Sequence, residues 1–263
     1  MVESFTTLSV RHENATGVRH ITINNPPLGV LNQTVRHELG SFFQGVQADQ
    51  GVRSVVFGSG PRSFCAGADL REFALRFNPE VARVHVCNAQ RMILALVELD
   101  VPSIAAIRGP CMGGGLELAL GTSYRIASHS ATLALPEVNR GAWPGTGGIL
   151  LLSRTIRPSL AKRLLFTGEQ LDATAAYELG LVDEVVDDDA LELRSQALAA
   201  QLAAQPRSSI RTMTRLIDRD FRTQFRSHLG YEAECFLQAY QLPSAREGYD
   251  AFFEKRQPRW EQD

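Results

Sequence analysis

Short apolar strands and amphipathic helices alternate along most of this chain, with glycine or proline at the strand ends. Residues 18–23 (VRHITI) place alternate side chains on two faces and stop at Asn24-Asn25-Pro26-Pro27, a pattern typical of a strand and a turn. Apolar runs at 54–57 and 103–107 predict buried strands, and apolar residues recur at helical spacing over 79–99. This alternation predicts an α/β fold class.

The C-terminal part of the chain has a different pattern, because helical periodicity replaces the strands almost completely after Ser159. Helices are predicted over 190–204, 208–225, 231–240 and 245–253. The composition also shifts near residue 205. We therefore expect a catalytic core over residues 1–205 and a helical C-terminal region over residues 206–263.

Composition and charge exclude several classes of protein. A chain of 263 residues that is 44% hydrophobic is typical of a globular protein. Its 27 Lys and Arg against 29 Asp and Glu give a formal net charge of −2, so no broad basic field for nucleic acid is expected. No apolar run approaches the ~18 residues of a membrane span. The first residues lack the apolar centre of a signal peptide, so we expect a cytoplasmic location.

The cysteines give no sign of a metal site. The four residues Cys65, Cys87, Cys111 and Cys235 form no C-x-x-C pair, and no histidine lies at zinc-ligand spacing from them. We expect reduced, mostly packed thiols and no bound metal.

Two loops rich in glycine and alanine follow predicted strands. Gly113-Gly114-Gly115 lies between a strand and a helix, where the first backbone N–H groups of the helix have no internal partner. The loop 64–70 (FCAGADL) follows the strand at 54–57. Each loop is able to offer one N–H to a single oxygen, which is what stabilising an enolate requires. Neither G-x-G-x-x-G nor a P-loop motif occurs, so a nucleotide-binding loop is a poor fit.

Five segments, in order, resemble the crotonase (enoyl-CoA hydratase/isomerase) family over about residues 5–258. They are 65–70 (CAGADL), 107–118 (IRGPCMGGGLEL), 135–148 (LPEV…WPGTGG), 165–183 (LFTGE…AYELGLVD) and 244–258 (SAREG…FEKRQP). The resemblance implies a crotonase-like spiral of ββα units with a helical C-terminal trimerisation region. It also implies an acyl-CoA substrate, a homo-trimer or hexamer, and no cofactor apart from the CoA of the substrate.

Two glutamates stand on the family's catalytic motifs. Taken alone, Glu117 in the first turn of a helix is explained by the helix dipole, and Glu137 by an ordinary carboxylate at a strand end. The resemblance changes this, because family hydratases keep both glutamates and the isomerases typically keep only the second. Adding water to an enoyl thioester needs one proton removed from water and one delivered to carbon, which two carboxylates share. The implied oxyanion donors are the N–H groups of Ala68 and Gly114.

The resemblance therefore implies an enoyl-CoA hydratase, with a lyase reaction that yields a 3-hydroxyacyl-CoA. Alternatives are an enoyl-CoA isomerase or decarboxylase of the same fold, or a non-catalytic CoA-binding oligomer. The expected substrate- and CoA-binding residues are Ala66, Asp69, Leu70, Arg71, Trp143 and Lys255.

This chain departs from the common hydratase pattern at two places. Trp143 stands where family hydratases commonly have Ile, Leu or Phe, and 147–152 reads GGILLL where they commonly read GGTQRL. The indole either shortens the acyl pocket or packs under the loop.

Overall fold

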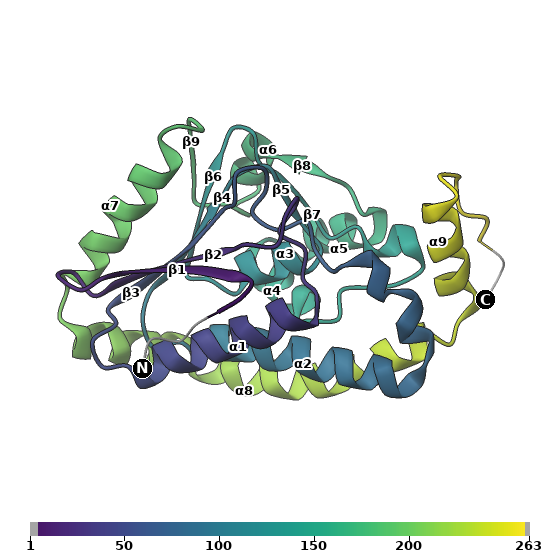
Figure 1. Cartoon of the computed structure of the whole chain (residues 1–263), viewed down its shortest axis with the longest axis horizontal. Coiled ribbons are helices and arrows are strands. Elements are labelled where there is room, and N and C mark those ends of the chain that lie inside the picture. The colour runs from purple at the N-terminus through teal and green to yellow at the C-terminus, as the bar shows by residue number, and fades with distance from the viewer. Residues whose placement is uncertain (1–4, 261–263) are drawn as a thin grey trace.

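Two β-sheets form the centre of the computed structural model, which describes residues 5–260 (Figure 1). The larger sheet has the order β1 (Leu8–Glu13), β2 (Val18–Ile23), β3 (Ser54–Gly58), β4 (Ser103–Ile107), β6 (Tyr124–Ser128) and β9 (Glu184–Val186). β1 pairs antiparallel with β2, and the other neighbours are parallel. The smaller sheet has the order β5 (Pro110–Met112), β7 (Thr132–Ala134) and β8 (Leu171–Asp172).

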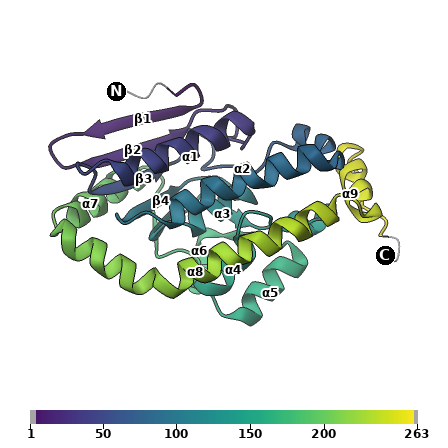
Figure 2. The same ribbon diagram turned by 90° about the horizontal axis from the view of Figure 1, so that it is seen from below.

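Helices cover both faces of the larger sheet. The α-helices of the described residues are α1 (Gln33–Ala48), α2 (Pro79–Val97), α3 (Gly114–Leu120), α4 (Gly148–Thr155), α5 (Pro158–Thr167), α6 (Ala173–Glu178), α7 (Leu191–Ala203), α8 (Arg207–Ala239) and α9 (Pro243–Phe253). The 3-10 helices are η1 (Leu70–Glu72), η2 (Ala74–Phe77) and η3 (Glu137–Arg140). Helix α2 lies between α1 and α8 on one side of the molecule, and α7 lies along the opposite face of the sheet (Figure 2).

The alternation of side chains along β3 explains why helices pack on both faces of the larger sheet. Val55 and Phe57 point into the main buried cluster together with apolar residues of α1 and α2, whereas Val56 points to the cluster that contains Leu191 and Ala199 of α7. Successive residues of a strand face opposite sides of a sheet, so an almost continuously apolar strand is buried on both faces.

The local elements follow the sequence pattern closely in the first half of the chain. The predicted strands at 18–23 and 103–107 are β2 and β4. Asn32 caps α1, since its side chain accepts a hydrogen bond from the Val35 N–H at 2.9 Å. β1 has no counterpart among the predicted strands, because Leu8 is its only buried residue.

The prediction of separate helices at 208–225 and 231–240 is wrong. Helix α8 runs without interruption for 33 residues and contains Gly230. One glycine costs only about 1 kcal/mol in a helix interior. Burial of Phe225, Leu229 and Phe236 against the rest of the chain offsets that cost.

Helix α9 approaches η3 with no side-chain layer between their backbones. A Cβ added to Gly141, which has a φ of +60°, would lie 2.2 Å from the Ser244 carbonyl oxygen, and one added to Gly248 would lie 2.3 Å from the Arg140 carbonyl carbon. Both positions therefore require glycine. Within residues 5–260, no helix is both long enough and apolar enough to cross a membrane.

The mixed α/β body with a helical C-terminal region agrees with the predicted crotonase fold class.

Candidate active site

The triple-glycine loop carries one of the two expected oxyanion donors. Gly113 has a φ of +52°, and a Cβ added there would lie 2.7 Å from Oε1 of Glu137, so this position requires glycine. Gly114 is the first residue of α3, and its N–H therefore has no acceptor inside the helix.

The second loop is held beside the first by backbone pairing. The N–H of Met112 donates to the Cys65 carbonyl at 3.0 Å, and Cys65 and Cys111 form a parallel bridge. A Cβ added to Gly114 would lie 4.0 Å from the Ala68 nitrogen. The structure thus brings Ala68 and Gly114 together at one cavity.

Glu117 is buried on α3, with a side chain 3% exposed. Its Oε1 accepts hydrogen bonds from the N–H groups of Thr146 (2.9 Å) and Gly148 (3.0 Å). Burial raises the pKa of Glu117, and the charges of Glu137 and Glu232 raise it further, against the effect of the two N–H donors. This carboxyl is thus able to take up and release a proton near neutral pH.

Glu137 begins η3 and faces the same cavity. Its Oε2 is buried and has no hydrogen-bond partner in the chain. Burial raises the pKa of Glu137, while its own backbone N–H and the nearby Arg140 oppose the increase. Two carboxyls with raised pKa values at one cavity are the arrangement that acid–base catalysis uses.

The cavity between these groups has a volume of about 500 Å³. Its lining includes most of the residues singled out in the sequence, namely Ala66, Ala68, Leu70, Gly114, Glu117, Glu137 and Trp143. The ring of Trp143 also packs on the aromatic cluster of Phe73, Phe236 and Tyr240.

Three expected binding residues do not line this cavity. Arg71 is 80% exposed and pairs side-on with Asp69 through Nε and Nη2, at 2.7–3.1 Å. Asp69 also caps η1 by accepting from the Arg71 N–H. Lys255 is exposed just after α9, with a φ of +54°.

The sequence pattern did not indicate Glu232 of α8, which binds the backbone of the loop next to Glu117. Its side chain is 3% exposed, and Oε2 accepts the Gly147 N–H at 2.7 Å. The other oxygen lies 3.5 Å from Nε2 of His228. Carboxylates therefore bind three successive N–H groups of the 146–148 loop, Glu117 from one side and Glu232 from the other. No motif indicated this role, because Glu232 lies 85 residues from its partner in sequence.

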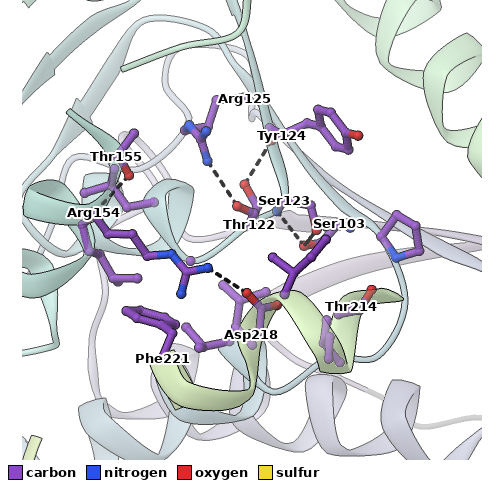
Figure 3. Close-up of a pocket in the computed structure, with 18 of the residues that line it drawn as sticks. Ser103, Thr122, Ser123, Tyr124, Arg125, Arg154, Thr155, Thr214, Asp218 and Phe221 are labelled. Carbon is purple, nitrogen blue, oxygen red and sulfur yellow. Dashed lines mark hydrogen bonds and ion pairs between the residues drawn. The ribbon is translucent and has the colours of Figure 1, made fainter. Parts of the chain in front are cut away.

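A second cavity, of about 550 Å³, lies at the amino ends of β4 and β6 beside the start of α8 (Figure 3). Several of its polar side chains bind within the chain: Arg154 pairs with Asp218 at 2.9 Å, and the Thr122 hydroxyl donates to the carbonyls of Ala119 and Tyr124 at 2.7 and 2.9 Å. None of the expected site residues lines this cavity. The expected site residues therefore meet at the first cavity, beyond the carboxyl ends of β3 and β4.

Known proteins share this architecture and much of the sequence. A family model described as enoyl-CoA hydratase/isomerase matches residues 13–263. A probable enoyl-CoA hydratase of Bacillus subtilis is 34% identical over 241 residues, covering 91% of this chain and 93% of the relative. A short-chain-enoyl-CoA hydratase of Clostridium acetobutylicum is 32% identical over 238 residues, covering 90% and 91%.

Solved structures give the same result. The crystal structure of a carnitinyl-CoA hydratase from Mycobacterium avium superimposes with a TM-score of 0.84 at 30% identity, covering 98% of this chain and 99% of that one. The sequence match and the shared fold extend over nearly the whole chain, and so this chain belongs to the enoyl-CoA hydratase/isomerase family.

Proposed function

We propose that this chain is a hydratase that adds water across the double bond of a 2-enoyl-CoA thioester to give a 3-hydroxyacyl-CoA. The observation that supports this most directly is the pair Glu117 and Glu137, whose pKa values are both raised and which face one cavity. The relatives named as hydratases are consistent with it.

In the proposed mechanism, the N–H groups of Ala68 and Gly114 donate to the thioester oxygen. Glu117 removes a proton from water as the water oxygen bonds to C3. Negative charge then develops on the thioester oxygen, where two fixed donors stabilise it. Glu137 delivers a proton to C2, and the double bond is saturated without a free enolate leaving the cavity.

The two-carboxylate mechanism has a direct test. We expect Glu117→Gln and Glu137→Gln each to lower hydration of crotonyl-CoA by roughly 10²–10⁴, because an amide keeps the size of the side chain but transfers no proton. The loss of enoyl-thioester absorbance measures the rate, and Glu80→Gln, on the exposed start of α2, is the control. A Glu117→Gln enzyme that hydrates crotonyl-CoA at the parental rate would overturn the proposal.

Assaying a 3-enoyl-CoA in parallel separates hydration from isomerisation. An isomerase needs only Glu137 for proton transfer between carbons, so Glu117→Gln would spare double-bond migration while Glu137→Gln abolishes it. A hydratase loses its activity in both variants. The absence of any cofactor requirement, the roles of Asp69, Arg71 and Lys255 toward CoA, and the cytoplasmic location stay predictions.

A further inference from the structure

One wall of the catalytic cavity contains a buried arginine with no acidic partner. Arg76 of η2 lines the cavity and is 4% exposed. Its Nη1 donates to the Tyr240 hydroxyl at 3.0 Å, whereas Nε and Nη2 are buried and have no hydrogen-bond partner. Across the described residues 5–260, no carboxylate oxygen lies within 4.0 Å of an Arg76 nitrogen.

A neighbouring arginine in the same wall does have an acidic partner. Arg36 is also 4% exposed, but it pairs with Glu72 at 2.7 Å and donates to the Leu31 carbonyl at 2.7 Å, so that only its Nε lacks a hydrogen-bond partner. An unpaired guanidinium removed from water is costly unless an anion compensates it. The rings of Phe73 and Tyr240, with centroids 5.7 and 5.9 Å from the Arg76 Cζ, supply only a weak cation–π attraction by comparison.

The nearby His85 does not change the net charge around Arg76. His85 stacks on Phe236 with ring centroids 5.7 Å apart. Burial lowers the pKa of His85 well below its usual value, and the charges of Arg76 and Arg36 lower it further. The imidazole is therefore neutral, so His85 adds no charge to this wall. Arg140 also lines the cavity and has a buried Nε without a partner, but its guanidinium lies over the Phe252 ring and interacts with the charge of Glu137.

The two unpartnered nitrogens have the geometry of a carboxylate receptor. Nε–H and Nη2–H form one edge of the planar guanidinium, and this edge binds both oxygens of a carboxylate in parallel. Arg71 uses the same edge to hold Asp69 in this chain. The free edge of Arg76 thus has the chemistry that matches a carboxylate. Because neighbouring side chains cover both nitrogens, those side chains must move for a carboxylate to bind there.

Arg76 shares its cavity with the proposed catalytic carboxyls. Arg76, Tyr240 and Glu137 all line this space of about 500 Å³, and Arg76 donates to the Tyr240 hydroxyl. A molecule that spans from Glu137 to Arg76 within a cavity of this size needs only a short chain.

We propose that the acyl group of the substrate is short and ends in a second carboxylate, which the Nε–Nη2 edge of Arg76 binds. The substrate class is then an ω-carboxy-2-enoyl-CoA. The hydration of this substrate rests on the proposed function. Binding of the carboxylate by Arg76 does not depend on any reaction.

Binding of saturated thioesters tests the site without any reaction. Glutaryl-CoA and pentanoyl-CoA have the same five-carbon chain and differ by the terminal carboxylate. We expect calorimetry on the full chain to show glutaryl-CoA binding at least about tenfold more tightly, as a desolvated charge pair gives. Arg76→Met removes this difference, and Arg83→Met, an exposed arginine on α2, keeps it.

The other outcomes are decisive as well. Equal affinity of the parent for glutaryl-CoA and pentanoyl-CoA, and for adipyl-CoA and hexanoyl-CoA, overturns the proposal. An equal loss of affinity for CoA, pentanoyl-CoA and glutaryl-CoA in Arg76→Met overturns it too, since Arg76 would then bind a CoA phosphate. Arg76→Lys keeps the positive charge but lacks the two-nitrogen edge, and we expect it to keep part of the preference for glutaryl-CoA over pentanoyl-CoA. This variant tests the proposal if Arg76→Met does not fold.

Turnover separates this inference from the proposed function. We expect glutaconyl-CoA to be hydrated with a higher kcat/KM than 2-pentenoyl-CoA, and Arg76→Met to reduce that ratio by about 10–100-fold. If neither thioester is hydrated while glutaryl-CoA still binds preferentially, the hydratase proposal fails and the anion site stands. If both are hydrated equally well and the binding preference is absent, the anion site fails and the hydratase proposal stands.

Discussion

Glu117 is subject to two opposing influences at the level of the single residue. Burial and neighbouring negative charges favour its protonated form, while the N–H groups of Thr146 and Gly148 favour the carboxylate. The net effect is a raised pKa. The folded chain therefore holds this proton more tightly than the unfolded chain does.

This has a consequence for stability against pH. The stabilisation that comes from the Glu117 proton is complete below the ordinary carboxyl pKa and is lost as pH rises through the raised pKa. We expect Glu117→Gln to melt with the parent at pH 5 and to be more stable than the parent at pH 9 by roughly 1–3 kcal/mol. Melting curves of both proteins at the two pH values measure this. A constant difference between the curves would show that Glu117 titrates as an exposed carboxyl.

Trp143 is a second residue whose role is open to measurement. Its indole lines the cavity and packs with Phe73 and Phe236, so it occupies volume that a longer acyl chain requires. We expect Trp143→Ala to raise kcat/KM for an eight-carbon enoyl-CoA relative to crotonyl-CoA by about tenfold, as added methylenes gain room. Trp143→Phe is the matched control with an intermediate effect. An unchanged ratio of the two rates would identify Trp143 as packing only.

At the level of elements, the 144–148 loop is bound by two helices that are far apart in the sequence. Helix α3 binds it through Glu117, and helix α8 binds it through Glu232. Glu117 faces two other titratable groups, Glu137 and Glu232, and Glu232 in turn faces His228. Glu232 is thus a positioning residue that also acts on the pKa of Glu117.

Two substitutions separate these effects of Glu232. Glu232→Gln keeps an acceptor for the Gly147 N–H but removes a charge that raises the pKa of Glu117. Because Glu117 must be ionised to act as the base, we expect the acidic limb of the pH–kcat profile to move to lower pH, with kcat at its maximum largely kept. Glu232→Met leaves the buried N–H without an acceptor, and we expect kcat to fall by about tenfold with the KM little changed. Identical pH profiles in parent and Glu232→Gln would limit Glu232 to a structural role.

The elements also show which parts of the structure the sequence pattern predicts and which it does not. Apolar periodicity and the Asn32 cap predict β2, β4 and α1, because these signals are local. Gly230 misleads, since the packing of α8 on α2 outweighs the weak helix preference of one glycine. Glu117, Glu137, Ala68 and Gly114 stand on motifs and were predicted as site residues. Glu232 and Arg76 were not, because their roles depend on partners far away in the sequence.

The whole molecule leaves large apolar side chains exposed on the first half of α8. Met213 is 49% exposed, and Leu216 and Ile217 are each 71% exposed. Met213 and Ile217 also line the second cavity, as does Phe221. Apolar surface of this kind beside a cavity is typical of an interface between protein chains.

We expect the chain to form a trimer or hexamer with this part of α8 at the interface, as the family resemblance implies. Sedimentation of the parent at micromolar concentration is expected to give a multiple of the 29.0 kDa chain, and Ile217→Asp to shift it toward monomer. Leu193→Asp, which changes an equally exposed leucine on α7, serves as the control. A parent that sediments as a monomer contradicts this expectation.

The contact of α9 with η3 has a consequence for how activity is lost. Gly141 and Gly248 bring the two backbones together with no intervening side chains, and η3 begins with Glu137. Detachment of α9 therefore removes the support of the segment that carries this carboxyl, while the central sheet keeps its own core. The free energy of this local opening, read from amide hydrogen exchange in α9, should then set the onset of inactivation by heat or denaturant, ahead of global unfolding.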